Sequence, residues 1–166
     1  VALVTGASRG IGAAVALTLA ELGAAVAVNY RERADDAETI VARIKAGGGR
    51  AIAVAADVSQ AAAVAAMVEQ VASVLGPIEI LVNNAGVAIV RGVDDLTEDD
   101  FDRTIAIKLK SAFLCTQAVL PAMRARTRCC SSRPLQAARQ RSAASRSRWP
   151  ERNPRLSRKR LRQAVR

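Results

Sequence analysis

A glycine-rich motif lies directly after an apolar run at the start of the chain. Residues 1–4 read Val-Ala-Leu-Val and are followed by Thr5-Gly-Ala-Ser-Arg-Gly-Ile-Gly12. Glycines at this spacing allow a tight turn, let the backbone approach a pyrophosphate and let a helix pack closely on a strand. The free N–H groups at the start of that helix attract phosphate charge. The motif therefore predicts a strand, a phosphate-binding turn and a helix that together bind a dinucleotide.

Apolar runs alternate with amphipathic stretches after this motif. Further strands are predicted at 25–28, 51–55 and 78–82, and helices at 11–22, 34–46 and 64–75. Such alternation favours a parallel sheet with helices on both faces, because each crossover returns over the sheet with the same hand. We therefore predict an α/β fold, a Rossmann-like doubly wound parallel sheet that stops after about four strands.

A long helix is predicted from residue 98 to about Arg126. Thr97 and Asp100 have the spacing of a capping box, and apolar residues recur at helical steps after them, with Pro121 predicted to kink the helix. Apolar runs along the chain are shorter than the roughly 18–20 residues of a membrane-spanning helix, and no leader precedes Val1. A cytoplasmic protein without a membrane segment is expected.

Positive charge is concentrated in the last quarter of the chain. The net charge is +10, yet residues 127–166 hold 12 Arg, one Lys and one acid, which leaves 12 basic and 14 acidic residues before them. Residues 127–166 also lack apolar periodicity, so we predict a disordered Arg-rich tail or a segment read in a shifted frame. Three cysteines without histidine favour neither a metal site nor a disulfide framework, and Cys115 is predicted to be an apolar helix residue.

An ordered set of motifs in residues 1 to about 126 resembles the short-chain dehydrogenase/reductases, most closely the 3-oxoacyl-(acyl-carrier-protein) reductases. The set comprises Thr5–Gly12, Ala56-Asp57-Val58, Asn83-Asn-Ala-Gly86 and the helix at 101–126. The resemblance implies that the glycine loop holds the pyrophosphate, that the Asp-Val pair contacts adenine, and that the Asn-Asn-Ala-Gly turn lines the ribose. The implied cofactor-binding residues are Gly6, Ser8, Arg9, Gly10, Ile11, Gly12, Arg31, Asp57, Val58, Asn84, Ala85 and Gly86, whereas Asn83 is expected to be mainly structural.

The cofactor is predicted to be NADP(H) rather than NAD(H). A carboxylate at the end of the second strand would bind the ribose 2′-hydroxyl of NAD, and here that position is assigned to Asn29. Arg31 and Arg9 are placed to contact a 2′-phosphate. The alternative is that Glu32 neutralises Arg31, which would then be one of several solvated charges.

The residues with which the resembling enzymes transfer hydride have no counterpart in this chain. Those enzymes use a Tyr-x-x-x-Lys pair, a serine and a relay asparagine, whereas the one tyrosine here is Tyr30, expected beside the adenosine. Lys108 occupies the relay position, and an ammonium donates but does not accept hydrogen bonds. Two alternatives stay open for Lys108: a surface lysine or, because it shares a helix face with Phe101 and Ile105, a partly buried lysine with a depressed pKa. Ser131 and Ser132 are flanked by Cys130 and Arg133-Pro134, which suits no buried strand.

Several functions therefore stay open. The resemblance implies NADP(H)-dependent reduction of a 3-oxoacyl-like carbonyl, or oxidation of the alcohol, but the chain itself is predicted to be a cofactor-binding, catalytically impaired fragment. The alternatives are a module that binds nucleic acid non-specifically through the tail, and a regulatory pseudoenzyme. Self-association through the 98–126 helix is also expected from the resemblance, and the open edge of the fourth strand predicts low solubility.

Overall fold

The structure is a computed structural model that describes the backbone of residues 1–130 and the side chains of residues 1–126. Val1–Thr127 form one compact unit. The expectations about the Arg-rich tail and about Ser131 and Ser132 fall outside the described residues.

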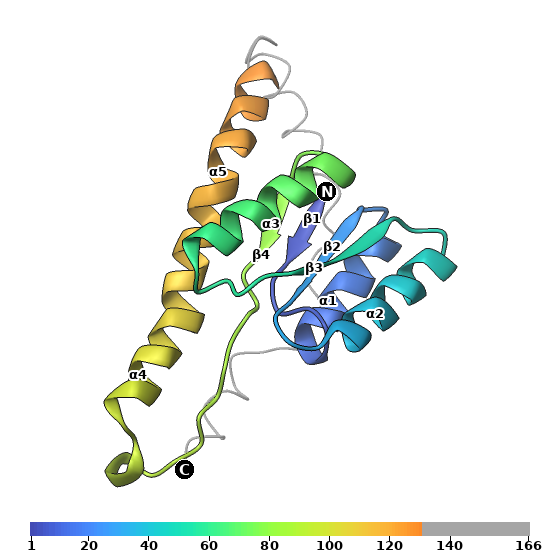
Figure 1. The fold of residues 1–166 in the computed structure, drawn as a ribbon. Helices are drawn as coiled ribbons and strands as arrows, with labels where there is room; N and C mark the ends of the chain where they lie inside the picture. The colour runs from blue at the N-terminus through green and yellow to red at the C-terminus, as the bar shows by residue number, and fades with distance from the viewer. Residues whose placement is uncertain (131–166) are drawn as a thin grey trace, which may run out of the picture. The chain divides into compact units, whose positions relative to one another are not determined.

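A parallel sheet of four strands lies at the centre of this unit (Figure 1). The strands are β1 (Ala2–Val4), β2 (Val26–Tyr30), β3 (Ala51–Ala55) and β4 (Ile80–Val82), in the order β3-β2-β1-β4. Leu3 of β1 lies beside Ala27 of β2 and Leu81 of β4. The predicted Rossmann-like sheet is confirmed, although β2 extends two residues beyond its predicted end at Val28.

Helices cover both faces of the sheet. They are α1 (Gly10–Glu21), α2 (Ala34–Ala46), α3 (Ala61–Val74), α4 (Glu98–Ile105) and α5 (Ser111–Cys130). One apolar core joins α1 and α2 to one face, and a second core joins α3 and α5 to the other (Figure 1). Successive side chains of a strand point to opposite faces, so β1 supplies Ala2 and Val4 to the first core and Leu3 to the second.

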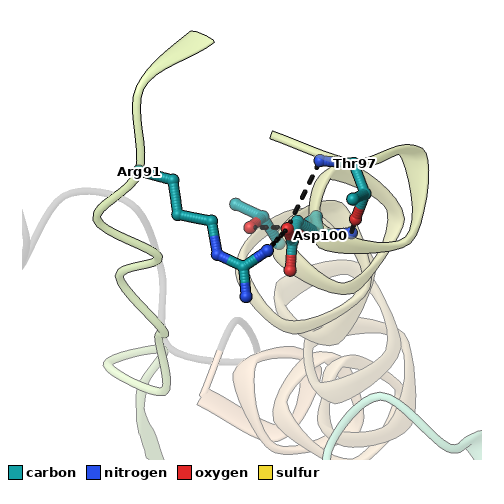
Figure 2. A network of polar contacts seen from close by, with 4 residues as sticks. Arg91, Thr97 and Asp100 are labelled. Atoms are coloured by element: carbon teal, nitrogen blue, oxygen red, sulfur yellow. Dashed lines mark hydrogen bonds and ion pairs between the residues drawn. The ribbon is translucent and has the colours of Figure 1, made fainter. Parts of the chain in front are cut away.

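The predicted capping box at the start of α4 is present (Figure 2). The Thr97 hydroxyl accepts a hydrogen bond from the Asp100 N–H (3.2 Å), and the Asp100 carboxylate accepts one from the Thr97 N–H (3.3 Å). Arg91 donates to the same carboxylate at 3.0 Å. The hydrogen bonds from Thr97, its backbone N–H first, hold the pKa of Asp100 below its ordinary value. The box fixes where the long helix begins.

The long helix is less regular than its sequence predicts. A π-helical turn at Ala106–Lys110 separates α4 from α5, and Pro121 lies inside α5. Taken together, Glu98–Arg126 is long and apolar enough to cross a membrane by length and composition, which corrects the expectation that no segment reaches that length. Core helices of soluble proteins pass the same test, so this finding alone does not assign a membrane segment.

Apolar surface is exposed at β4 and along the long helix. Within the described residues β4 pairs only with β1, and Ile80 of β4 is 42% exposed. Phe101, Ile105, Leu109 and Phe113, which follow one another at four-residue steps, are also exposed. An unpaired strand edge beside apolar surface is a template for further association.

We therefore predict that the 166-residue chain aggregates in dilute buffer and that Ile80→Lys reduces this aggregation, because a charge on an edge strand opposes edge-to-edge pairing. Light scattering at matched concentrations measures the effect. The control is Val74→Lys, which adds the same charge at a site on α3 that is 54% exposed. A wild-type chain that stays monodisperse and unfolds in one cooperative thermal transition would contradict the prediction.

Candidate cofactor site

A cleft of about 660 Å³ lies where the segments that follow all four strands meet. This volume falls within the roughly 300–1,000 Å³ of small-molecule and cofactor sites. In open parallel sheets, ligands bind outside the carboxyl ends of the strands. This cleft lies at those ends. The structure brings all twelve predicted cofactor-binding residues to its walls, namely Gly6, Ser8, Arg9, Gly10, Ile11, Gly12, Arg31, Asp57, Val58, Asn84, Ala85 and Gly86. Their role in binding stays a prediction.

Two glycines of the loop are required by its geometry. Gly6 has φ +61°, in the left-handed region that side chains disfavour, and a Cβ there would lie 2.9 Å from the Ala85 Cα. A Cβ on Gly12 would lie 2.4 Å from Asn84 Nδ2 and 2.6 Å from the Gly6 carbonyl oxygen. The loop and the turn after β4 therefore pack too closely for any side chain at either position.

Thr5 and Asn84 join the glycine-rich loop to the turn after β4. The Thr5 hydroxyl accepts hydrogen bonds from the N–H groups of Asn84 and Ala85, both at 3.0 Å. Asn84 Nδ2 donates to the carbonyl oxygens of Thr5 (2.9 Å) and Gly6 (3.0 Å). Asn84 is a residue that the resemblance places beside the ribose. Its side-chain nitrogen Nδ2 is engaged here in holding the loop.

Asn83 has fewer partners than its neighbour. Its side chain is exposed and donates to the Thr116 hydroxyl at 3.3 Å. Its amide therefore links the end of β4 to α5, in keeping with the structural role expected of it.

The end of β2 differs from the sequence interpretation. The strand ends at Tyr30 rather than near Asn29, and Asn29 is 2% exposed with its amide hydrogen-bonded inside the sheet. Tyr30 is partly buried and packs against the core formed with α1 and α2. The side chain at the strand end is therefore a phenol, so the position that would select NAD still carries no carboxylate.

Charges at the mouth of the cleft are partly paired. Arg31 forms an ion pair with Glu32, the alternative that the sequence left open, and its side chain stays 40% exposed. Arg33 pairs with Asp36 at 3.3 Å. Exposed ion pairs of this kind are worth little, so a phosphate can compete with Glu32 for Arg31.

Asp57 is fixed by its neighbour two residues on. Burial alone would raise its pKa, but hydrogen bonds from the Ser59 hydroxyl (2.7 Å) and the Ser59 N–H (2.9 Å), together with the charge of Arg31, hold the pKa below its ordinary value. Asp57 is therefore ionised at neutral pH and is a hydrogen-bond acceptor at the wall of the cleft.

The structure adds residues that the sequence motifs did not indicate. Arg103 of α4 and Ile107 of the π-helical turn, four residues apart, line the same cleft as Asp57 and Val58. Their helical spacing is the one signal in the sequence that they share a face. Ile11 also lines the cleft, and it is 78% exposed although it is apolar.

Lys108 and Cys115 have no chemical role that the geometry supports. Lys108 is exposed, as in the first of the two alternatives and not the partly buried one, and its Cε lies 3.9 Å from where a Cβ on Gly86 would be. Cys115 is fully buried, and burial raises the pKa of its thiol to about 11. Among the described residues, no cluster of three His, Cys, Asp or Glu side chains is placed to hold a metal ion.

Comparison of the sequence with known protein families shows the family of this chain. The model of the short chain dehydrogenases matches residues 1–129, over three quarters of the chain. This chain belongs to the short chain dehydrogenase family. Among its relatives, an uncharacterized oxidoreductase of Methylorubrum extorquens is 46% identical over 118 residues, which cover 71% of this chain and 48% of that protein.

Two further relatives show how much of the family fold is present. The 3-oxoacyl-[acyl-carrier-protein] reductase of Synechocystis is 44% identical, and the match covers 72% of this chain and 48% of the reductase. A short chain dehydrogenase from Burkholderia cenocepacia, solved in complex with NADP, superposes with a TM-score of 0.70 at 47% identity and covers 72% of this chain and 49% of that one. The chain thus spans about half the length of the relatives it matches.

We predict that Gly12→Ala lowers both the unfolding midpoint and the affinity for NADP⁺, because the added methyl collides with Asn84 and Gly6. Overpacking of this kind costs about 1–3 kcal/mol. Thermal unfolding and titration with NADP⁺ measure the two effects.

The matched control is Gly47→Ala at the end of α2. Gly47 has φ −80°, and the nearest atom to an added Cβ is the Ile44 carbonyl oxygen at 3.5 Å, so this change should leave both quantities unaltered. Equal behaviour of the two variants would contradict the assigned loop packing.

Proposed function

We propose that residues 1–126 bind NADP(H) and that the 166-residue chain does not itself transfer hydride. The observation that carries the proposal is the preformed glycine-rich loop, with Gly6 in a left-handed conformation and Gly12 packed against Asn84. The start of α1 leaves its first N–H groups without helical partners, which suits a pyrophosphate. The NADP complex of the Burkholderia cenocepacia relative supports the same ligand class.

Adenine is proposed to bind between the segment after β3 and the π-helical turn. Asp57, Val58 and Ile107 all line the cleft, although the Val58 side chain is 6% exposed and belongs to the second core. We expect the Asp57 carboxylate to accept from the exocyclic amine of adenine and the partly buried Ile107 side chain to offer apolar surface to the ring. The exposed Ile11 is then covered by bound cofactor.

A preference for NADP(H) over NAD(H) is proposed from Arg9 and Arg31. Arg9 is exposed at the start of α1, and no carboxylate ends β2 to bind a free 2′-hydroxyl. The pairing of Arg31 with Glu32 opposes the preference, because the ion pair must open before the guanidinium contacts a phosphate. We therefore expect a modest rather than an absolute preference.

The absence of hydride transfer is proposed from the composition of the chain. Its one tyrosine, Tyr30, is partly buried beside α1 and α2, and no Tyr-x-x-x-Lys occurs in the 166 residues. Reduction of a 3-oxoacyl thioester, as in the named reductase relatives, would need a proton donor that this chain does not supply. The chain is proposed to act as a cofactor-binding half or as a regulatory pseudoenzyme.

Two further associations are proposed more narrowly. The exposed residues Phe101, Ile105 and Leu109 on one stripe of the long helix support self-association through residues 98–126. The 12 arginines of residues 127–166 support non-specific binding of nucleic acid at low salt. A cytoplasmic location stays a prediction.

In fluorescence titrations we expect NADPH to bind up to about tenfold more tightly than NADH, since one charge-assisted contact is worth roughly 1–2 kcal/mol. Arg31→Ala should remove most of that difference. Arg43→Ala, which deletes an exposed arginine on α2 outside the cleft, should leave it unchanged.

The titrations are run at high as well as low salt, because the Arg-rich segment attracts the phosphates of both cofactors by counterion release. Binding in the cleft should persist at high salt and be lost in Gly12→Ala. A preference that disappears with salt and survives Gly12→Ala would contradict the proposed site.

With NADPH and a 3-oxoacyl thioester, we expect no loss of absorbance at 340 nm above the buffer rate. A full-length 3-oxoacyl-(acyl-carrier-protein) reductase in the same buffer is the positive control. Clear turnover by the 166-residue chain would contradict the proposed loss of catalysis.

A further inference from the structure

We propose that Asn29 is a positioning residue that holds the glycine-rich loop in its phosphate-binding conformation and thereby sets the affinity for a dinucleotide. The inference deepens the proposed function and rests on it, because the loop matters only if a cofactor binds there. Asn29 belongs to none of the sequence motifs, and the sequence interpretation gave it no contact with the loop.

Asn29 is a polar residue buried inside the sheet. It is the last residue but one of β2 and is 2% exposed, between the central strand β1 and the edge strand β3. Burying an amide is costly unless its hydrogen bonds are made. The Asn29 side chain therefore needs hydrogen-bond partners, and it finds them on the glycine-rich loop and at the end of β3.

Its side chain bonds the loop on one side and the end of β3 on the other. Oδ1 accepts a hydrogen bond from the Gly6 N–H at 3.1 Å. Nδ2 donates toward the carbonyl oxygens of Val54 and Ala56, both at 3.2 Å, and of Tyr30 at 3.3 Å. The backbone carbonyl of Asn29 also accepts from the Ala7 N–H at 2.8 Å. One residue thus fixes two consecutive N–H groups of the loop.

Gly6 is held from both sides as a result. Its N–H is bound by Asn29, and its carbonyl oxygen accepts from Asn84 Nδ2 at 3.0 Å. Glycine loses more conformational freedom on folding than any other residue, so a glycine at φ +61° keeps one conformation only when its neighbours hold it. Fixing Gly6 fixes the direction in which residues 7–12 enter α1.

The site requires an amide in particular. The Gly6 N–H needs an acceptor, while the Val54 and Ala56 carbonyl oxygens face Nδ2, whose two hydrogens can serve both. The Tyr30 carbonyl oxygen also accepts from the Ala56 N–H at 2.9 Å. A side-chain amide supplies acceptor and donor from one planar group. An ionised aspartate supplies the acceptor but turns its second oxygen toward carbonyl oxygens. Leucine has nearly the same shape and supplies neither. These two residues therefore separate the acceptor role of Asn29 from its donor role.

The test compares Asn29→Asp and Asn29→Leu with the wild-type chain. Hydrogen exchange of residues 5–12 in the cofactor-free protein should be faster in both variants at neutral pH. Affinity for NADP⁺ should fall about tenfold or more, the range expected when a buried hydrogen-bonding group loses its partner. Cys115→Ser is the control, because it places a hydroxyl in the core on α5 and destabilises the fold without touching the loop.

The pH profile gives a readout that a merely structural residue would not move. Burial raises the pKa of an aspartic acid, and the protonated acid again donates to a carbonyl oxygen while accepting from Gly6. The affinity of Asn29→Asp relative to wild type should therefore recover as pH falls, whereas that of Asn29→Leu should not. Arg31 and Asp57 face the same cleft in all these proteins. The ratio of variant to wild-type affinity at each pH therefore cancels the pH dependence that these two residues and the 2′-phosphate contribute.

Three results would overturn the inference: Asn29 variants that bind NADP⁺ as wild type does, loop exchange that rises only in step with global stability as in Cys115→Ser, or no recovery of Asn29→Asp at acid pH. A wild-type chain that fails to bind NADP⁺ would instead contradict the proposed function. In that case the exchange rates of the cofactor-free proteins alone decide the role of Asn29.

Discussion

The site depends on the two-sided anchoring of the peptide groups around Gly6. Asn29 from β2 binds the Gly6 N–H, and Asn84 after β4 binds the Gly6 carbonyl oxygen. Because β1 lies between these two strands, the anchors reach the loop from both sides of the strand that leads into it. The conformation of the glycine-rich turn therefore depends on the central position of β1 in the sheet.

Much of this arrangement could be predicted from the sequence. The motif from Thr5 to Gly12 fixes a strand, a turn and a helix by local geometry, and the alternation of elements then allows few sheet topologies. Residues that follow parallel strands necessarily meet at one edge, so the twelve predicted residues share a cleft. Local signals thus carried most of the fold and most of the candidate site.

Features that depend on three-dimensional context could not be predicted in the same way. Asn29 reads as the polar end of a short strand, because nothing in a single sequence shows that its amide has partners on two other segments. Arg103 of α4 and Ile107 of the π-helical turn line the cleft, and no sequence motif marks either residue. The sequence leaves two alternatives for Arg31, and the pairing with Glu32 is decided by how adjacent side chains turn. The limits of a strand can be predicted only to within a few residues.

The described residues form the cleft although the chain holds no Tyr-x-x-x-Lys pair. The segments that follow the four strands line the cleft, and the second core includes Cys115 and Val119 of α5. Nothing in that assembly requires a proton donor. The exposed edge of β4 and the apolar stripe of the long helix are then the surfaces at which the fold is most open to other partners.

The central claim is that residues 1–126 hold a dinucleotide in the cleft, and not merely by charge. Intermolecular nuclear Overhauser measurements between NADP⁺ and isotope-labelled protein test it most directly, because they report which protein protons lie beside the adenine. We expect transfer between the adenine protons and the methyl groups of Ile107, which is partly buried and lines the cleft. Binding of NADP⁺ without any transfer to Ile107 would place the ligand elsewhere and contradict this claim.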